Sequence, residues 1–240
     1  MIVYKSLPRI SAITFDIDDT FYDNTPIIRA AEKSLSNHIE KTYPAASALN
    51  KPDWLRFKKD ALASDPSLQH DMGSQRKAVL TKAFMHIQMS PELIPNAVED
   101  CFTTFYNKRS DFSVRQEIVD VLSALAQHFS LVAITNGNVD CEAIGISNYF
   151  KHVLHAGKDG RMKPNPDMFD KASNLLAVPP ANILHVGDNL EKDVKGAINA
   201  GYSSAWYADD RKMLISNEVL TVLPHIQLRS LSDLIQLIPS

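Results

Sequence analysis

The second half of the chain alternates short apolar segments with longer amphipathic ones, a pattern that few folds satisfy. Strand-like segments lie at 131–134, 152–155, 183–186, 205–207 and 225–228. Helix-like segments lie among them at 139–150, 166–177 and 190–200, and another follows from about residue 230. Apolar strands that alternate with helices form a parallel sheet covered on both faces. The pattern therefore predicts an α/β domain.

A further strand, at 11–15, stands alone near the start of the chain. Residues 26–107 then show helical periodicity, for example in the stripe Ile27, Ala31, Leu35 and Ile39. A single strand is not stable by itself, so we expect this one to join the later strands. The predicted architecture is a Rossmann-like three-layer α/β core, residues 1–22 and 109–240, interrupted by an inserted all-helical domain, residues 23–108.

Composition agrees with this division and argues against several functions. Of the 8 glycines, only Gly73 precedes residue 137, so tight turns and close backbone approaches are concentrated in the α/β part. The net charge of −3 offers no basic surface for nucleic acid, and no apolar segment is long enough for a membrane span. Cys101 and Cys141 lack metal-ligand spacing, which predicts buried thiols in a reducing, cytoplasmic protein. The sequence does not indicate an oligomeric state.

Polar side chains follow the predicted strands at the edge where ligands bind in open α/β sheets. They are Asp16, Asp18, Asp19 and Thr20 after the first strand, Thr135 and Asn136 after 131–134, Lys163 a short loop after 152–155, and Asp188, Asn189 and Asp193 after 183–186. Because the carboxyl ends of parallel strands share one edge of a sheet, we expect these groups to converge.

Such a set of groups suits phosphoryl transfer. Crowded carboxylates repel one another unless a cation lies among them, and Mg²⁺ prefers carboxylate oxygens, waters and substrate phosphate. Lys163 and Thr135 would donate to a phosphate. An aspartate can attack phosphorus, and a second acid two residues on can protonate the leaving oxygen and later activate water. Taken singly, the aspartates are equally compatible with turn formation and Lys163 with a solvated surface.

The same strand ends carry the motifs of a known family. The chain resembles the haloacid dehalogenase superfamily, in its phosphatase branch with a helical cap inserted after the first strand. The resemblance rests on four segments in order: TFDIDDT at 14–20, VAITN at 132–136, KPNPDMF at 163–169, and ILHVGD at 183–188 with Asp193. Asp19 stands where many members have Gly, and Phe21 where Leu is usual.

The resemblance implies roles for the motif residues. Asp16 would be the nucleophile and Asp18 the general acid and base. Thr135 and Lys163 would hold the transferring phosphoryl group, with Asn136 beside it. These assignments describe a phosphomonoester hydrolase that works through an aspartyl-phosphate.

The resemblance also implies a magnesium site. Its ligands would be Asp16, the backbone carbonyl of Asp18, and Asp188. Asp193 would be a supporting carboxylate, and Thr20 and Asn189 would support the same site.

A narrower resemblance concerns the substrate. The segments TFDIDDTFYDN, LVAITNGN, HAGKDGRMKP, ILHVGDNLEKDV and LPHIQL resemble bacterial phosphatases that act on 5-amino-6-(5-phospho-D-ribitylamino)uracil and flavin mononucleotide. A small phosphate ester of the riboflavin pathway is therefore the expected partner. Phosphatases of other sugar phosphates or nucleotides, a 2-haloacid dehalogenase and a catalytically silent binding module remain alternatives.

The helical insert is expected to shield the reaction from water and to contact the leaving group. Tyr22 is a candidate contact at the entry to the insert. Arg76 is another, because Gly73 nearby permits close backbone approach to a ligand.

Overall fold

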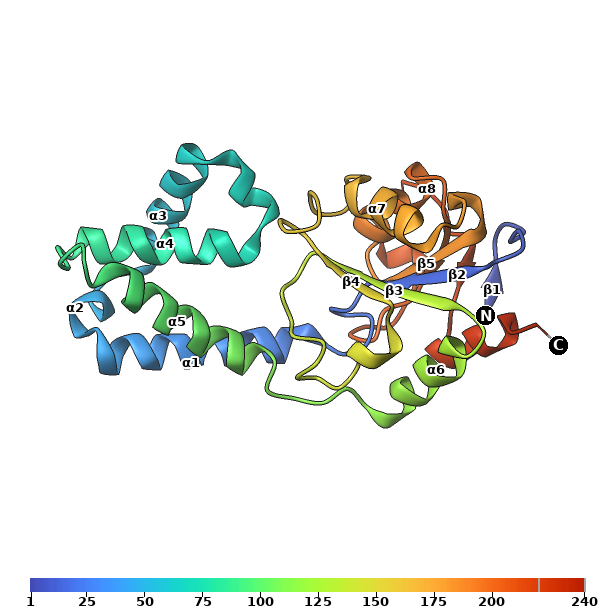
Figure 1. Ribbon diagram of the computed structural model, residues 1–240, viewed down its shortest axis with the longest axis horizontal. Helices are drawn as coiled ribbons and strands as arrows, with labels where there is room; N and C mark the ends of the chain where they lie inside the picture. Colours follow the sequence, from blue (N-terminus) through green and yellow to red (C-terminus); the bar gives the residue numbers. More distant parts are fainter. Residues whose placement is uncertain (220, 240) are drawn as a thin grey trace. The chain divides into compact units, whose positions relative to one another are not determined.

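The isolated strand near the start of the sequence joins the strands of the second half in one sheet (Figure 1). In the computed structural model, which describes residues 1–219 and 221–239, this strand is β2 (Ala12–Phe15). It lies between β3 (Ser130–Thr135) and β5 (Ile183–Gly187), runs parallel to both, and is buried along its whole length. The predicted parallel α/β core is therefore confirmed.

The sheet has seven strands in the order β1-β7-β6-β5-β2-β3-β4. The other parallel strands are β4 (His152–His155), β6 (Ser203–Trp206) and β7 (Ile226–Gln227). β1 (Ile2–Val3) pairs antiparallel with β7 and was not predicted. Both residues of β1 are exposed, so no pattern of buried apolar positions marks this strand in the sequence.

The register of the central strands fixes the position of the polar loops. Phe15, the last residue of β2, lies opposite Ala133 of β3 and Val186 of β5. The residues that follow these three strands therefore emerge at one edge of the sheet. Asp16 still bonds to the ladder, because its backbone N–H donates to the carbonyl of Val186 at 2.8 Å.

Helices cover both faces of the sheet. α7 (Asp167–Leu176) and α8 (Gly196–Asn199) lie over one face, and α6 (Gln116–Ala126) lies over the other (Figure 1). Met168 and Phe169 of α7 pack into a cluster with Ile134 and Leu154 of the sheet, and all four are buried. Burial of each such side chain contributes about 1.5–3 kcal/mol.

Several predicted helices of the α/β part are shorter or of another type. The segment 139–150 holds only the 3₁₀ turn η2 (Ser147–Tyr149), because the Asp140 carboxylate caps the N–H groups of Glu142 and Ala143 and Gly145 has a φ of +84°. The segment 190–200 is the π-helix η4 (Leu190–Lys195) followed by α8. Other 3₁₀ segments are η3 (Pro180–Asn182), η5 (Ile215–Asn217) and η6 (Leu231–Leu237).

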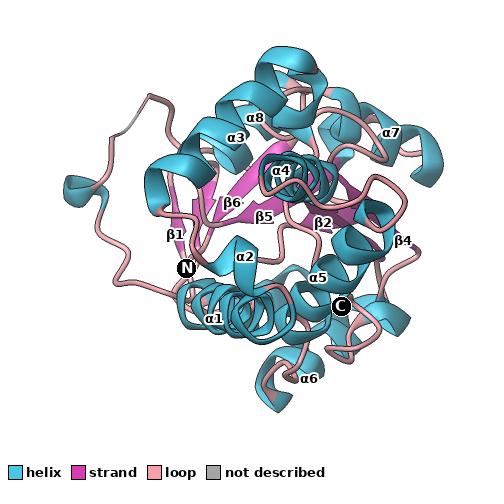
Figure 2. Ribbon diagram, turned by 90° about the vertical axis from the view of Figure 1, so that its left-hand side faces the viewer, coloured by secondary structure: helices cyan, strands magenta, loops and turns pink. Residues whose placement is uncertain are grey.

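The chain divides into two compact units, Met1–Asn24 with Phe112–Ser240, and Thr25–Asp111. The predicted boundaries, after residues 22 and 108, lie close to these. Every regular element within Thr25–Asp111 is helical (Figure 2). The elements are α1 (Asn24–Thr42), α2 (Pro44–Ser47), α3 (Lys51–Ser64), η1 (Pro66–His70), α4 (Met72–His86) and α5 (Ile94–Arg109).

Three of the four residues of the apolar stripe predicted in the first helix of this unit face its core; in place of Ile27, its neighbour Ile28 packs against the cluster. Ala31, Leu35 and Ile39 of α1 are buried in one cluster with Leu80 and Phe84 of α4. Both cysteines are free and buried, as predicted. None of the described helices combines the length and the apolar character that crossing a bilayer requires.

Candidate active site

A lysine joins two of the predicted carboxylates inside the protein. The Nζ of Lys163 lies 2.8 Å from Oδ1 of Asp16 and 2.7 Å from Oδ1 of Asp193, and only 1% of its side chain is exposed. Burial lowers the pKa of Lys163, but the two carboxylates outweigh that effect and raise it above its ordinary value. Lys163 is therefore held as a cation, at the edge of the sheet where its sequence position predicts it.

Asp193 is held from three sides. Besides Lys163, its Oδ1 accepts from Nε2 of the buried His185 at 3.2 Å, and its Oδ2 accepts from the backbone N–H of Asn189 at 2.9 Å. Burial lowers the pKa of His185 to about 4, so the ring is neutral near pH 7. A neutral ring that donates through Nε2 accepts at Nδ1, where the Thr14 hydroxyl lies at 2.8 Å.

The buried pair shapes the charge of the site. Burial favours the protonated form of Asp193, yet the charge of Lys163 and the contact with His185 hold its pKa below the usual range. Burial also raises the pKa of Asp16 well above its usual value, although Lys163 opposes this shift. Asp193 therefore stays ionised beside Lys163, whereas a further cation would favour the ionised form of Asp16.

Asp18 contacts a tyrosine and a glycine. The Tyr22 hydroxyl donates to Oδ1 of Asp18 at 2.6 Å, and the Tyr22 ring packs edge-on against Phe112 at 4.6 Å between centroids. A Cβ placed on Gly137 would run into Oδ2 of the same carboxylate. Tyr22 lies in the α/β unit, and its predicted contact with the leaving group stays a prediction.

The loop after β3 fixes the position of Lys163. The Asn136 side chain accepts from the backbone N–H of Lys163 at 2.7 Å and donates to its carbonyl at 2.9 Å. The fully buried Thr135 accepts at Oγ1 from the N–H of Gly137 at 2.9 Å. The amide of Asn136 thus pins the backbone that carries the buried ammonium, a contact that the spacing of the two residues did not reveal.

Three carboxylates lie close enough to hold a metal ion. One oxygen each of Asp16, Asp188 and Asp193 lies within 4.8 Å of the others. Burial, together with the charge of Asp193, raises the pKa of Asp188 to about 7, and this shift favours a cation beside it. Both oxygens of Asp193 are already bonded, Oδ1 to Lys163 and His185 and Oδ2 to the N–H of Asn189. Asp16 and Asp188 each have one oxygen in an ion pair, with Lys163 and with Arg211, and are therefore the members better suited to a divalent ion. This all-oxygen donor set fits Mg²⁺.

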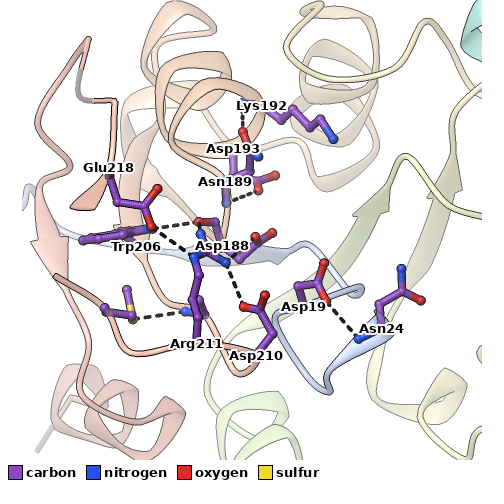
Figure 3. Close-up of polar contacts among 12 residues, drawn as sticks. Asp19, Asn24, Asp188, Asn189, Lys192, Asp193, Trp206, Asp210, Arg211 and Glu218 are labelled. Carbon is purple, nitrogen blue, oxygen red and sulfur yellow. Dashed lines mark hydrogen bonds and ion pairs between the residues drawn. The ribbon is translucent and has the colours of Figure 1, made fainter. Parts of the chain in front are cut away.

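The remaining predicted residues are Thr20, Asn189 and Arg76. Thr20 is fully buried, and its hydroxyl has no hydrogen-bond partner in the described part of the chain. The Asn189 side chain caps η4 by accepting from the N–H groups of Glu191 and Lys192, and Figure 3 shows the second of these contacts. Arg76 forms an ion pair with Glu32 at 2.7 Å, and its guanidinium lies 3.5 Å from the centroid of the Phe105 ring.

The backbone at Asp19 explains one departure from the family pattern. Asp19 has a φ of +61°, in the left-handed region that glycine adopts most easily. Aspartate is among the few other residues that tolerate this region. The Asp19 side chain also accepts from the N–H of Asn24 at 2.8 Å (Figure 3), which closes the loop after β2.

Comparisons with known proteins identify the family of the chain. The model of the haloacid dehalogenase-like hydrolase family matches residues 10–201. The chain belongs to this family. It is 37% identical to the 5-amino-6-(5-phospho-D-ribitylamino)uracil phosphatase YigB of Escherichia coli, over 98% of this chain and 99% of that protein. It is 27% identical to the human N-acylneuraminate-9-phosphatase, over 98% and 96% of the two chains.

Solved structures of this hydrolase family share the fold. A 2-haloacid dehalogenase from Pseudomonas syringae superposes with a TM-score of 0.89 at 29% identity, over 95% of this chain and 97% of that one. The predicted family and the predicted enzyme class, a phosphatase of the haloacid dehalogenase superfamily, are confirmed by the family match and the YigB relative.

Proposed function

We propose that the protein is a Mg²⁺-dependent phosphomonoesterase that works through an aspartyl-phosphate on Asp16. The observation that carries this proposal is the buried cation of Lys163 between Asp16 and Asp193, with the carboxylate of Asp188 in the same cluster. Asp18 follows Asp16 by two residues in the turn after β2. A fixed cation beside a nucleophilic carboxylate is the arrangement that an incoming phosphate dianion needs.

In the first step, a carboxylate oxygen of Asp16 attacks phosphorus. The bond between phosphorus and the ester oxygen breaks as the new bond forms, and the leaving oxygen takes a proton from Asp18. Lys163 and Thr135 stabilise the negative charge on the transferring group. Tyr22 and Gly137 fix the direction of the Asp18 carboxylate, which must reach the leaving oxygen.

In the second step, Asp18 accepts a proton from a water molecule that attacks the phosphorus of the aspartyl-phosphate. The acyl phosphate bond breaks, inorganic phosphate leaves, and Asp16 returns to its free carboxylate form. Mg²⁺ bound by Asp16, the Asp18 carbonyl and Asp188 would offset the negative charge of the phosphoryl oxygens. Asp193 takes part in neither proton transfer, because the neighbouring Lys163 keeps it ionised.

We propose 5-amino-6-(5-phospho-D-ribitylamino)uracil or flavin mononucleotide as the substrate. The similarity to YigB, whose name states the first of these substrates, supports this choice. The helical unit Thr25–Asp111 is proposed to act as a cap that excludes water and contacts the leaving group. A cytoplasmic location is consistent with both proposals and stays a prediction.

A phosphate-release assay tests the function. The purified protein is expected to release phosphate from the two flavin-related substrates faster than from a panel of sugar phosphates and nucleotides. Excess EDTA should abolish the release, and added Mg²⁺ should restore it. The structural similarity to a 2-haloacid dehalogenase makes 2-chloropropionate the matched comparison. Chloride release without phosphate release would overturn the proposal.

Gly187 is expected to be indispensable for this activity. A Cβ at this position would lie 2.5 Å from Cβ and 2.7 Å from Oδ2 of Asp193, which has no room to retreat among its three partners. Gly187→Ala should therefore displace Asp193 and Lys163 and lower kcat by more than about 10²-fold, since small misplacements of positioning groups cost this much. Gly145→Ala is the control for backbone strain without a clash: its φ of +84° strains an alanine, but its Cβ would meet no atom within 4 Å, so the site should stay in place. Equal activity of both variants would contradict the expected role of Gly187.

A further inference from the structure

Arg211, on the loop after β6, donates two hydrogen bonds to Asp188 (Figure 3). Nη1 of Arg211 donates to Oδ2 of Asp188 at 3.0 Å, and Nη2 donates to the backbone carbonyl of the same residue at 2.9 Å. The indole N–H of Trp206 donates to that carbonyl at 2.7 Å. These three contacts fix Oδ2 and the backbone carbonyl of Asp188, and none of them involves Oδ1.

Arg211 is itself held in place. Its Nε donates to Glu218 at 3.0 Å and its Nη1 donates to Asp210 at 2.7 Å, while 31% of its side chain remains exposed. The same loop reaches the turn after β2, because the N–H of Asp209 donates to the carbonyl of Asp19 at 2.7 Å. The loop after β6 therefore contacts the turns that follow β2 and β5.

We propose that Arg211 is a positioning residue for the magnesium site: it holds one oxygen of Asp188 so that the other is directed to the cation. This inference rests on the proposed function, since it assigns Asp188 to Mg²⁺. A carboxylate that ligates a metal through one oxygen commonly has its other oxygen bonded by a second protein group, and such partners orient the ligand. A planar guanidinium suits this task because its two terminal nitrogens reach a side chain and a carbonyl together.

Charge repulsion alone predicts that Arg211 weakens metal binding, whereas the positioning role predicts that it strengthens metal binding. A positive guanidinium next to a metal ligand weakens the binding of a second cation, so its removal alone should tighten metal binding. Orientation predicts that its removal weakens metal binding, because Asp188 becomes free to rotate away. The direction of the change in affinity therefore separates the two effects.

The test uses Mn²⁺ as a spectroscopic substitute for Mg²⁺. The electron paramagnetic resonance signal of free Mn²⁺ gives the dissociation constant of Mn²⁺ from the protein. Competition with Mg²⁺ shows whether the two ions bind at the same site. Arg211→Met keeps the length of the side chain and removes its donors, and Arg211→Lys keeps the charge but not the fork. Arg115→Met is the matched control, since Arg115 pairs with Asp209 on the same loop without an observed contact to Asp188.

We expect Arg211→Met to raise the dissociation constant about 10-fold, the size of effect seen when a partner of a metal ligand is removed. Arg211→Lys should fall between this variant and the natural protein, and Arg115→Met should bind like the natural protein. If Arg211→Met is not folded by circular dichroism, weakened binding by Arg211→Lys carries the test. Unchanged or tighter binding in the folded Arg211 variants would overturn the positioning role alone. Failure of the natural protein to bind Mn²⁺ in competition with Mg²⁺ would overturn the proposed magnesium site as well.

Discussion

Replacement of Asp16 by asparagine should lower phosphate release by at least about 10⁴-fold, because loss of a nucleophile leaves only binding and charge stabilisation. The amide has nearly the shape of the carboxylate but cannot form an acyl phosphate. It also keeps an oxygen that can accept from Lys163, which lies 2.8 Å from Oδ1 of Asp16 in the natural protein. The fold should therefore survive, with a thermal midpoint within about 5 °C of the natural one.

Two measurements separate chemistry from folding in this variant. Steady-state phosphate release gives the activity, and circular dichroism on heating gives the thermal midpoint. Asp170→Asn on α7 is the matched control, because Asp170 is exposed and lies outside the site, and it should retain full activity. Asp16→Asn activity close to the natural rate would remove Asp16 from the nucleophile role and with it the aspartyl-phosphate mechanism.

The edge on which the site lies could be predicted from the sequence for a simple physical reason. Parallel strands end at one edge, so the residues after each strand are neighbours whatever their separation in the chain. This rule alone places Asp16, Lys163 and Asp188 at a common site. Their mutual distances could not be predicted, because they depend on the loops between strand and side chain.

The partners of Tyr22 and Asn136 escaped prediction for the same reason. The Tyr22 hydroxyl reaches Asp18 through the turn after β2, and the Asn136 amide reaches across to the backbone of Lys163. The sequence pattern marks His185 only as part of a strand, where alternation places its side chain on one face of the sheet. Its contact with Asp193 depends on the geometry of η4, the segment after the strand that carries this carboxylate.

The rule that residues after parallel strands share one edge of the sheet also applies to Arg211. The pattern predicts a strand at 205–207, and its carboxyl end lies at the same edge as those of β2, β3 and β5. Asp209, Asp210 and Arg211 follow it closely. The same rule, applied to this strand, places a guanidinium near Asp188, although it does not identify the two atoms that the guanidinium contacts.

The second large effect is expected from Lys163→Met. This change leaves Asp16 and Asp193 buried without their common cation, and removal of one partner of a buried pair costs about 3–5 kcal/mol of unfolding free energy. For a chain of this size the thermal midpoint should fall by about 10 °C. Phosphate release should fall by more than about 10²-fold, because the positive charge that meets the phosphoryl group is lost.

The deficit in stability should depend on pH. In the natural protein Lys163 holds the pKa of Asp193 below its ordinary value, so their interaction contributes stability near pH 7 that is lost as the pH falls through and below about 4. In Lys163→Met, Asp193 takes up a proton more readily on acidification. Urea unfolding at pH 7 and at about pH 4, near the ordinary pKa of aspartate, should therefore show a smaller difference between variant and natural protein at the lower pH.

Lys171→Met provides the comparison for the loss of an ordinary lysine. Lys171 pairs with Asp159 at 2.9 Å on the surface, with 43% of its side chain exposed, and such pairs contribute at most about 1 kcal/mol. Its removal should leave activity and pH dependence unchanged. If Lys163→Met were no less stable than Lys171→Met at pH 7, the ammonium would not be the charge that holds Asp16 and Asp193 together. The negative charge of the buried Asp16 and Asp193 would then have to be offset in another way. A proton shared between the two carboxylates would be the first possibility to measure.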